Sequence, residues 1–292
     1  MKIFSWVLIA LLFAGCATHE PPPPQSRVPF ATGAQIAAYL TEAYNNLITM
    51  CRANPSAPPF LCSGVMLRAT KRSTQYHFWD PNPSSHAVSF SFLRKDSKFS
   101  KLVFGYNNGF IFSPYFFAAS GKIEPEIRCF FPVDGATSSR NDDGCGQVPG
   151  VPSGIPCQSQ NINTAAQYLA HYNSQPNKYH HLCGFDVRDH LNQAATVAFN
   201  EALKAQAQGG QFAFNTQNEF VLEKWGQGLG SSLPIQALFY LDDTGKVDAQ
   251  YDQRDFKTQT GIWIPMIKIT LPRTTAEDAT FQYIPADQAI SS

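Results

Sequence analysis

The chain has 292 residues, and its 22 lysines and arginines balance 22 aspartates and glutamates. No block of basic residues occurs, so we expect no nucleic-acid partner, because proteins that bind nucleic acids carry a basic patch. Aromatic residues make up 13% of the chain and charged residues only 15%, a composition that favours a β-rich core.

The first sixteen residues have the pattern of an export signal rather than of a folded segment. Lys2 precedes an apolar run over 3–13, which is too short to cross a bilayer as a helix. The end of the segment, Phe13-Ala14-Gly15-Cys16, resembles the lipobox of bacterial lipoproteins. We therefore expect a lipid anchor on Cys16 and a place in the cell envelope as an outer-membrane lipoprotein. A plain secretory cleavage site, which would give a secreted protein, is the alternative.

A proline-rich stretch separates this signal from the rest of the chain. Residues 17–30 contain four consecutive prolines, which favour a stiff polyproline II spacer that joins neither a sheet nor a helix. No second linker of this kind follows, and the remaining length suits one large domain. We therefore predict a signal peptide over 1–16, a linker over 17–30 and a single domain over 31–292.

The cysteine count supports an oxidising compartment. Of seven cysteines, setting aside Cys16 leaves an even set of six. Up to three disulfides would then stabilise the domain, each by about 2–4 kcal/mol, and sequence does not choose among the fifteen pairings. No CxxC or HExxH spacing occurs, so we predict no metal site. The disulfide candidates are Cys51, Cys62, Cys129, Cys145, Cys157 and Cys183.

The first half of the domain is predicted to form one helix followed by strands. Thr32 can cap a helix whose apolar residues recur at helical spacing until near Cys51. Ser89 and Ser91 alternate with phenylalanines, which is typical of a strand with two different faces. The expected strands cover 64–70, 88–92, 101–106, 109–112 and 127–131.

The second half begins with a loop region and two helices. Residues 134–160 show neither helical nor strand periodicity and are rich in Gly, Pro, Ser and Asn, which predicts a loop region held by disulfides. Thr164 opens a short helix that carries His171, and a longer helix covers 189–206 before two glycines stop it. The remaining expected strands cover 212–214, 219–223, 235–241 and 263–271. This order predicts an α+β fold with a mostly antiparallel, partly split sheet.

Three short sequence motifs suggest a catalytic site. An arginine ends one expected strand at Arg68, a Ser-x-Ser pattern occupies Ser89 and Ser91, and a Gln-x-Glu pattern places Gln217 before Glu219. This order resembles the arginine, serine and glutamate signature of ADP-ribosyltransferase toxins. The resemblance implies an ADP-ribosyltransferase-like fold and NAD as the substrate.

The chemistry of NAD cleavage suits these residue types. Residues two apart on a strand share a face, so Gln217 and Glu219 would line one cleft. Glu219 would stabilise the positive charge that develops on the ribose, as a carboxylate does in glycoside hydrolysis. Arg68 would pair with the diphosphate and Ser89 would orient Glu219. Three aromatic rings nearby in the sequence would stack on the nicotinamide or the adenine: Tyr76, Phe78 and Trp79.

Each of these residues also has a purely structural interpretation. Arg68 can cap a strand through a salt bridge, Ser89 and Ser91 can form a solvated strand face, and Glu219 can be an exposed edge charge. The stretch between Ser91 and Gln217 is also long for this signature. Three histidines near Cys183 could indicate a metal, although a disulfide-bonded cysteine is no ligand. They are His171, His180 and His181.

A resemblance over most of the chain adds to these motifs. The residues at 63–70, 79–83, 106–112, 183–188 and 217–219 are similar to those of halovibrin proteins. Halovibrins are exported bacterial proteins with NAD glycohydrolase or ADP-ribosyltransferase activity. The resemblance implies NAD as substrate, with water or a host or competitor protein as acceptor, and no cofactor beyond NAD.

Two non-enzymatic functions fit the same composition. One is a disulfide-bonded envelope lipoprotein whose aromatic surface binds a glycan, a peptidoglycan fragment or a protein partner. The other is an inhibitor or immunity-type protein anchored at the cell surface. Release of nicotinamide from NAD distinguishes the enzyme from both.

Overall fold

The computed structural model describes residues 32–46, 63–70, 87–112, 127–134, 145–146, 155–174, 183–188, 192–223, 235–261 and 263–289. Within these residues, nine strands form one sheet in the order β5-β4-β6-β2-β1-β3-β7-β8-β9. All neighbours are antiparallel except β7 and β8, which are parallel. The expected mixed α+β fold with a mostly antiparallel sheet is therefore confirmed.

The strands follow the expected positions closely in the centre of the sheet. The three central strands that matter most for the site are β1 (Val65–Thr70), β2 (Ala87–Leu93) and β6 (Glu219–Glu223). The other six are β3 (Asn108–Phe112), β4 (Ile127–Phe131), β5 (Phe185–Asp186), β7 (Ile235–Tyr240), β8 (Met266–Thr270) and β9 (Thr280–Gln282).

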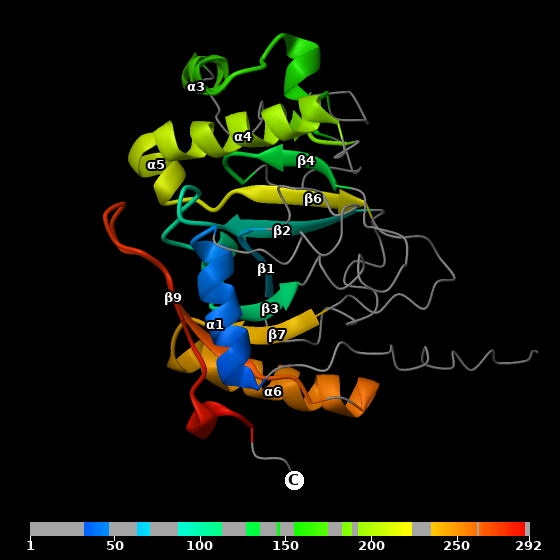
Figure 1. Cartoon of the computed structure of the whole chain (residues 1–292), viewed down its shortest axis with the longest axis vertical. Coiled ribbons are helices and arrows are strands. Elements are labelled where there is room, and N and C mark those ends of the chain that lie inside the picture. Colours follow the sequence, from blue (N-terminus) through cyan, green and yellow to red (C-terminus); the bar gives the residue numbers. More distant parts are fainter. Residues whose placement is uncertain are drawn as a thin grey trace, which may run out of the picture.

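Helices cover both faces of this sheet (Figure 1). Helix α4 packs on one face, where the Phe199 ring contacts rings from β2, β4 and β6; α3 lies outside α4, and α6 packs against β7, β3 and β8. Helix α1 lies across the middle strands and contacts β1, β8 and β9. The α-helices are α1 (Gly33–Tyr44), α3 (Ala165–Ser174), α4 (Gln193–Gln208), α5 (Gly210–Phe214) and α6 (Asp243–Thr260).

The first helix begins as predicted and ends earlier. The backbone N–H of Thr32 donates to Gln35 Oε1 (2.6 Å), and the Thr32 hydroxyl accepts from the Gln35 N–H (3.4 Å). This reciprocal capping box satisfies two of the N–H groups that a helix start leaves without partners. Helix α1 ends at Tyr44 rather than near Cys51, because Asn46 adopts the left-handed conformation, with φ of 61°.

Two expected strands are not strands. Residues 101–106 form a loop around a short 3-10 turn, Val103–Gly105, because Phe104 and Gly105 both have positive φ. Residues 212–214 belong to helix α5. Gly210, with φ of 65°, interrupts the helical path after α4, and the chain then makes another helical turn.

Helix α6 has no counterpart among the elements predicted from the sequence. Most of its side chains are polar, and a continuous apolar stripe is therefore absent. Its start nevertheless carries a standard signal, since the Asp242 carboxylate accepts from the Gly245 N–H at 2.8 Å. The buried positions recur at helical spacing, although two of them are polar: Ala249, Asp252, Gln253 and Phe256.

The sheet has an apolar core on each face. One core contains rings from β2, β4, β6 and α4 in contact with one another, and the stacked Phe130 and Phe220 rings have centroids 4.4 Å apart. The other lies under α1 and includes Leu40, Leu67 and Phe239. Consecutive residues of β1 alternate between the two cores, which confirms that both faces of the central strands are covered.

The ladder between β1 and β2 is short. It runs only from Val65 to Leu67 on β1, opposite Ser91 to Leu93 on β2. Beyond this point β1 stays paired with β3 as far as Thr70, and β2 stays paired with β6 as far as Ala87. The backbone pairing is thus divided between two groups of strands, as expected for a partly split sheet.

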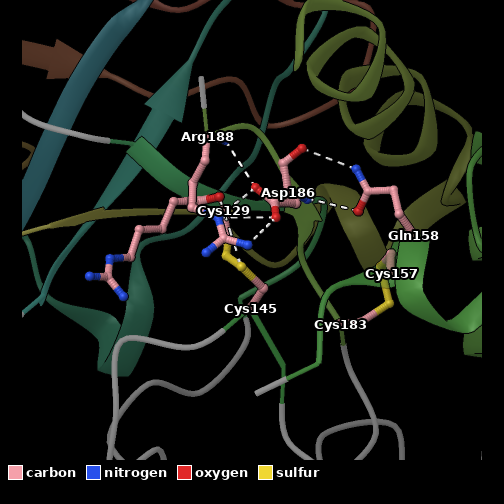
Figure 2. The surroundings of a disulfide bond; sticks show 8 residues. Cys129, Cys145, Cys157, Gln158, Cys183, Asp186 and Arg188 are labelled. Atoms are coloured by element: carbon pink, nitrogen blue, oxygen red, sulfur yellow. Dashed lines mark hydrogen bonds and ion pairs between the residues drawn. A yellow bond between two sulfur atoms is a disulfide. The ribbon is translucent and has the colours of Figure 1, made fainter. Parts of the chain in front are cut away.

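Two disulfides join the loop region to the sheet (Figure 2). Cys129 pairs with Cys145 and Cys157 pairs with Cys183, with Cα–Cα distances of 5.4 and 5.0 Å. These pairs confirm that four of the candidate cysteines form disulfides, while Cys51 and Cys62 lie outside the described residues. Nearby, the Gln158 amide bonds both the N–H and the C=O of Asp186, at 2.9 and 3.0 Å.

Candidate functional site

Ser89 and Glu219 form a direct side-chain contact in the middle of the sheet. Ser89 lies on β2, Glu219 begins the neighbouring strand β6, and Ser89 pairs with Val221. The Ser89 hydroxyl donates a hydrogen bond of 2.6 Å to Glu219 Oε1. Glu219 is only 1% exposed, and a buried carboxylate is stable only when hydrogen bonds or opposite charges compensate its lost hydration. Ser89 supplies part of that compensation.

Arg68 reaches the same serine from the strand on the other side of β2. Its Nη1 donates to the Ser89 backbone carbonyl oxygen at 2.7 Å. At this position the backbone ladder between β1 and β2 has already ended, so the guanidinium forms a link across the division in pairing. Three of the four predicted catalytic residues are therefore connected through Ser89, across three adjacent strands.

The register nevertheless places Arg68 and Glu219 on different faces of the sheet. Leu67 pairs with Ser91, and directly paired residues of antiparallel strands share a face. Ser89 and Glu219 lie on the face of Ser91, whereas Arg68, one residue after Leu67, points to the face of its partner Phe110. The register therefore does not support the expectation that the Arg68 and Glu219 side chains share one cleft.

Gln217 does not join this group. Strand β6 begins at Glu219, so the alternation that was expected to align the two side chains does not extend back to Gln217. The Gln217 Oε1 instead accepts from the Val103 N–H at 3.0 Å, and its carbonyl accepts from the Asp134 N–H at 2.7 Å. Gln217 thus anchors the 103–105 turn and the end of β4.

Asn218 lies between Gln217 and Glu219 and is not among the site residues predicted from the sequence. It is fully buried, and its side-chain amide bonds both the N–H and the C=O of Phe92 at 2.7 Å. Asparagine next to the first residue of a strand is a weak signal by itself. A fully buried amide at that place becomes visible only in three dimensions.

The other predicted binding residues lie outside the described part of the chain. These are Tyr76, Phe78 and Trp79, together with Cys16, His180 and His181. His171 is half-buried on α3. Among the described residues, no group of three or more His, Cys, Asp or Glu side chains is placed to hold a metal ion. None of the helices described is both long and apolar enough to cross a membrane.

Two ionisable groups with clearly shifted pKa values, Asp278 and Tyr44, contact each other at the β8–β9 connection. Lys98 and Lys95 lie 2.9 and 3.1 Å from Asp278, and their hydrogen bonds lower its pKa to about 2. The Tyr44 hydroxyl donates to Asp278 at 3.2 Å, and burial first of all raises the Tyr44 pKa to about 12. These contacts fasten α1 and the 95–98 turn to the C-terminal strands.

Fold and site together define a disulfide-bonded α+β protein in which a half-buried serine donates to a buried glutamate at the centre of a mostly antiparallel sheet. No protein-family model matches the chain, and the comparisons with curated proteins and solved structures gave no significant match. The geometry of the site itself therefore indicates which chemistry it can perform. An oriented carboxylate of this kind can accept hydroxyl protons and stabilise a neighbouring positive charge.

Proposed function

We propose that this protein cleaves the bond between nicotinamide and ribose in NAD, with Glu219 as the catalytic carboxylate. The observation that carries the proposal is the 2.6 Å hydrogen bond from the Ser89 hydroxyl to Glu219 Oε1. It unites two members of the arginine–serine–glutamate signature that are 130 positions apart in the chain. An exposed edge charge, the structural interpretation of Glu219, does not account for a carboxylate that is 1% exposed and accepts a hydrogen bond from the half-buried Ser89.

Cleavage of NAD needs a carboxylate that stabilises a positive charge on the ribose. The C1′–N bond breaks, both electrons leave with nicotinamide, and positive charge spreads over the ribose C1′ and ring oxygen. Glu219 stabilises this charge and accepts hydrogen bonds from the ribose hydroxyls. A water molecule then bonds to C1′ and loses a proton, which gives ADP-ribose. Transfer to a host or competitor protein follows the same course, with a nucleophilic side chain in place of water.

Ser89 and Arg68 have different parts in this proposal. Ser89 holds one carboxylate oxygen of Glu219, so the side chain loses the freedom to rotate away from the ribose. Arg68 donates to the Ser89 carbonyl and so supports the serine from the other face of the sheet. This contact favours a positioning role for Arg68 over the expected pairing with the diphosphate.

The disulfides are compatible with an exported protein. We propose that the chain is held at the cell envelope by a lipid on Cys16. Metabolic labelling with palmitate, compared between the wild-type chain and Cys16→Ser, tests this step. Equal labelling of both would remove Cys16 as the anchor, and absence of label from the wild-type chain would favour a secreted protein.

The activity itself is tested with the full chain and NAD, by following nicotinamide and ADP-ribose together. We expect nicotinamide release, with an equal amount of free ADP-ribose if water is the acceptor. A shortfall of ADP-ribose that appears only when a candidate acceptor protein is present indicates transfer to that protein. Absence of nicotinamide release contradicts the proposal and favours the binding-protein alternative, in which the 74% exposed ring of Phe104 is the natural contact.

A further inference from the structure

We propose that Asn218 is a positioning residue that holds Glu219 in place against Ser89. This inference rests on the proposed function and adds a residue to the site. Asn218 immediately precedes Glu219, and it would be the next residue of β6 to pair with β2, opposite Phe92. No backbone pair is formed there, because β6 begins only at Glu219.

The Asn218 side chain takes the place of that missing pair. Its Oδ1 accepts from the Phe92 N–H, and its Nδ2 donates to the Phe92 carbonyl oxygen, both at 2.7 Å. A carboxamide carries one acceptor and one donor group side by side, as a peptide unit does. The amide thus fixes β6 to β2 at the point where Glu219 enters the strand.

A second layer of contacts holds the amide itself. Asn218 Nδ2 also lies 2.8 Å from Ser97 Oγ and 2.7 Å from Gln206 Oε1. The Ser97 hydroxyl donates to that same Gln206 oxygen, and Gln206 belongs to α4. All three side chains are at most 3% exposed. The network therefore ties the start of β6 to α4 and to the turn after β2, with no water needed to complete it.

The geometry of Glu219 depends on this attachment. The Ser89–Glu219 hydrogen bond is diagonal, since Ser89 pairs with Val221 and not with Glu219 itself. A small shift or rotation at the beginning of β6 would carry the carboxylate away from the serine, and hydrogen bonds weaken steeply with distance and angle. Asn218 therefore acts on the carboxylate through the backbone, without contact to substrate.

The chain offers a matched control for this role. The Gln288 amide bonds the N–H and C=O of Met266 at 2.8 and 3.1 Å, which is the same double contact at the start of β8. Strand β8 is separated from β6 by five positions in the strand order. Removing the Gln288 amide therefore removes a comparable structural contact far along the sheet from Glu219.

The experiment compares Asn218→Ala, Asn218→Asp and Gln288→Ala with the wild-type full chain in steady-state nicotinamide release. We expect Asn218→Ala to lower kcat at least tenfold while its KM stays within twofold of the wild-type value. Gln288→Ala should lower Tm by a similar amount as Asn218→Ala but keep kcat within twofold of the wild-type value. For Asn218→Asp, the ionised carboxylate lacks the donor that the Phe92 carbonyl needs. Its protonated form regains that donor, so the ratio of its kcat to that of the wild type should rise as pH falls.

The outcomes separate this inference from the proposed function. If the wild-type chain releases nicotinamide and Asn218→Ala keeps its kcat, Asn218 has no positioning role. Equal losses of kcat in Gln288→Ala and Asn218→Ala would show a general effect of destabilisation and also overturn it. If Asn218→Ala does not fold, the Asn218→Asp variant decides the question by itself. A ratio of its kcat to the wild-type kcat that does not change with pH then overturns the positioning role of Asn218. Absence of nicotinamide release by the wild-type chain overturns both proposals together.

Discussion

The hydroxyl of Ser89 and the carboxylate of Glu219 meet at 2.6 Å, although 130 positions separate them in the chain. The contact exists because β6 pairs with β2, an arrangement of strands that are not consecutive in sequence. The described part of the chain between the two residues includes α3, α4 and both described disulfides.

Ser89→Ala should slow nicotinamide release without abolishing it. A hydrogen bond to a charged group contributes about 1.5–3 kcal/mol, which corresponds to about a 10- to 100-fold fall in kcat. Ser100→Ala serves as the control, because it removes a serine hydroxyl that bonds Asn215 at 3.1 Å and should leave kcat unchanged. A Ser89→Ala protein as active as the wild type would show that the hydroxyl does not orient Glu219.

The Asp278 cluster predicts a pH dependence of stability. Hydrogen bonds from Lys98 and Lys95 lower the Asp278 pKa from 3.8 to about 2 in the folded protein. Its contribution to stability is therefore present above about pH 4 and is lost as the pH falls to 2. The ion pairs are exposed, so we expect at most about 1 kcal/mol. In denaturant unfolding at several pH values, the free energy of unfolding of Asp278→Asn should fall less between pH 4 and pH 2 than that of the wild type. An equal fall in both proteins would contradict a stabilising role of the Asp278 ion pairs.

The Cys157–Cys183 disulfide should contribute strongly to stability. It closes a loop of 26 residues and is fully buried at both ends. Replacing both cysteines by alanine should lower the free energy of unfolding by about 3 kcal/mol in denaturant titrations. With reductant present, the variant and the wild type should unfold at similar denaturant concentrations. A difference that persists under reduction would assign the loss to packing rather than to the crosslink.

Phe104 should be a site where glycine stabilises the fold. It adopts the left-handed conformation with φ of 54°, which costs a bulky residue about 1–2 kcal/mol, and its side chain is 74% exposed. Phe104→Gly should therefore raise the free energy of unfolding by about 1 kcal/mol. Asn161→Gly, at φ of 61°, should give a smaller gain because asparagine tolerates this conformation. Equal gains at both positions would argue against strain at Phe104.

Much of the sheet could be predicted because its central strands have regular patterns. Strands β4 and β6 have the predicted limits, and the alternation around Ser89 and Ser91 correctly marks β2. Helix α6 could not be found from an apolar stripe, since buried Asp252 and Gln253 make its inner face partly polar. Such a face is stable only with the hydrogen bonds of the folded state, which a sequence does not display.

The candidate site was only partly predictable for a similar reason. The motif residues could be listed from the sequence, and the contact between Ser89 and Glu219 agrees with the expected orienting role. Which face each residue occupies depends on strand register and on where a strand begins. Arg68 points to the opposite face, and Gln217 lies before the first residue of β6. Neither fact is contained in the spacing of the motif.

Glu219 is the residue on which the proposed cleavage of NAD depends. The decisive measurement is the rate of nicotinamide release from NAD by the wild-type chain and by Glu219→Gln at equal concentration. The substitution preserves size and hydrogen-bonding ability but removes the negative charge that stabilises the developing cation. We predict release by the wild type and at least about a 100-fold lower kcat for the variant. No release by the wild type, or equal rates for both proteins, would contradict the account.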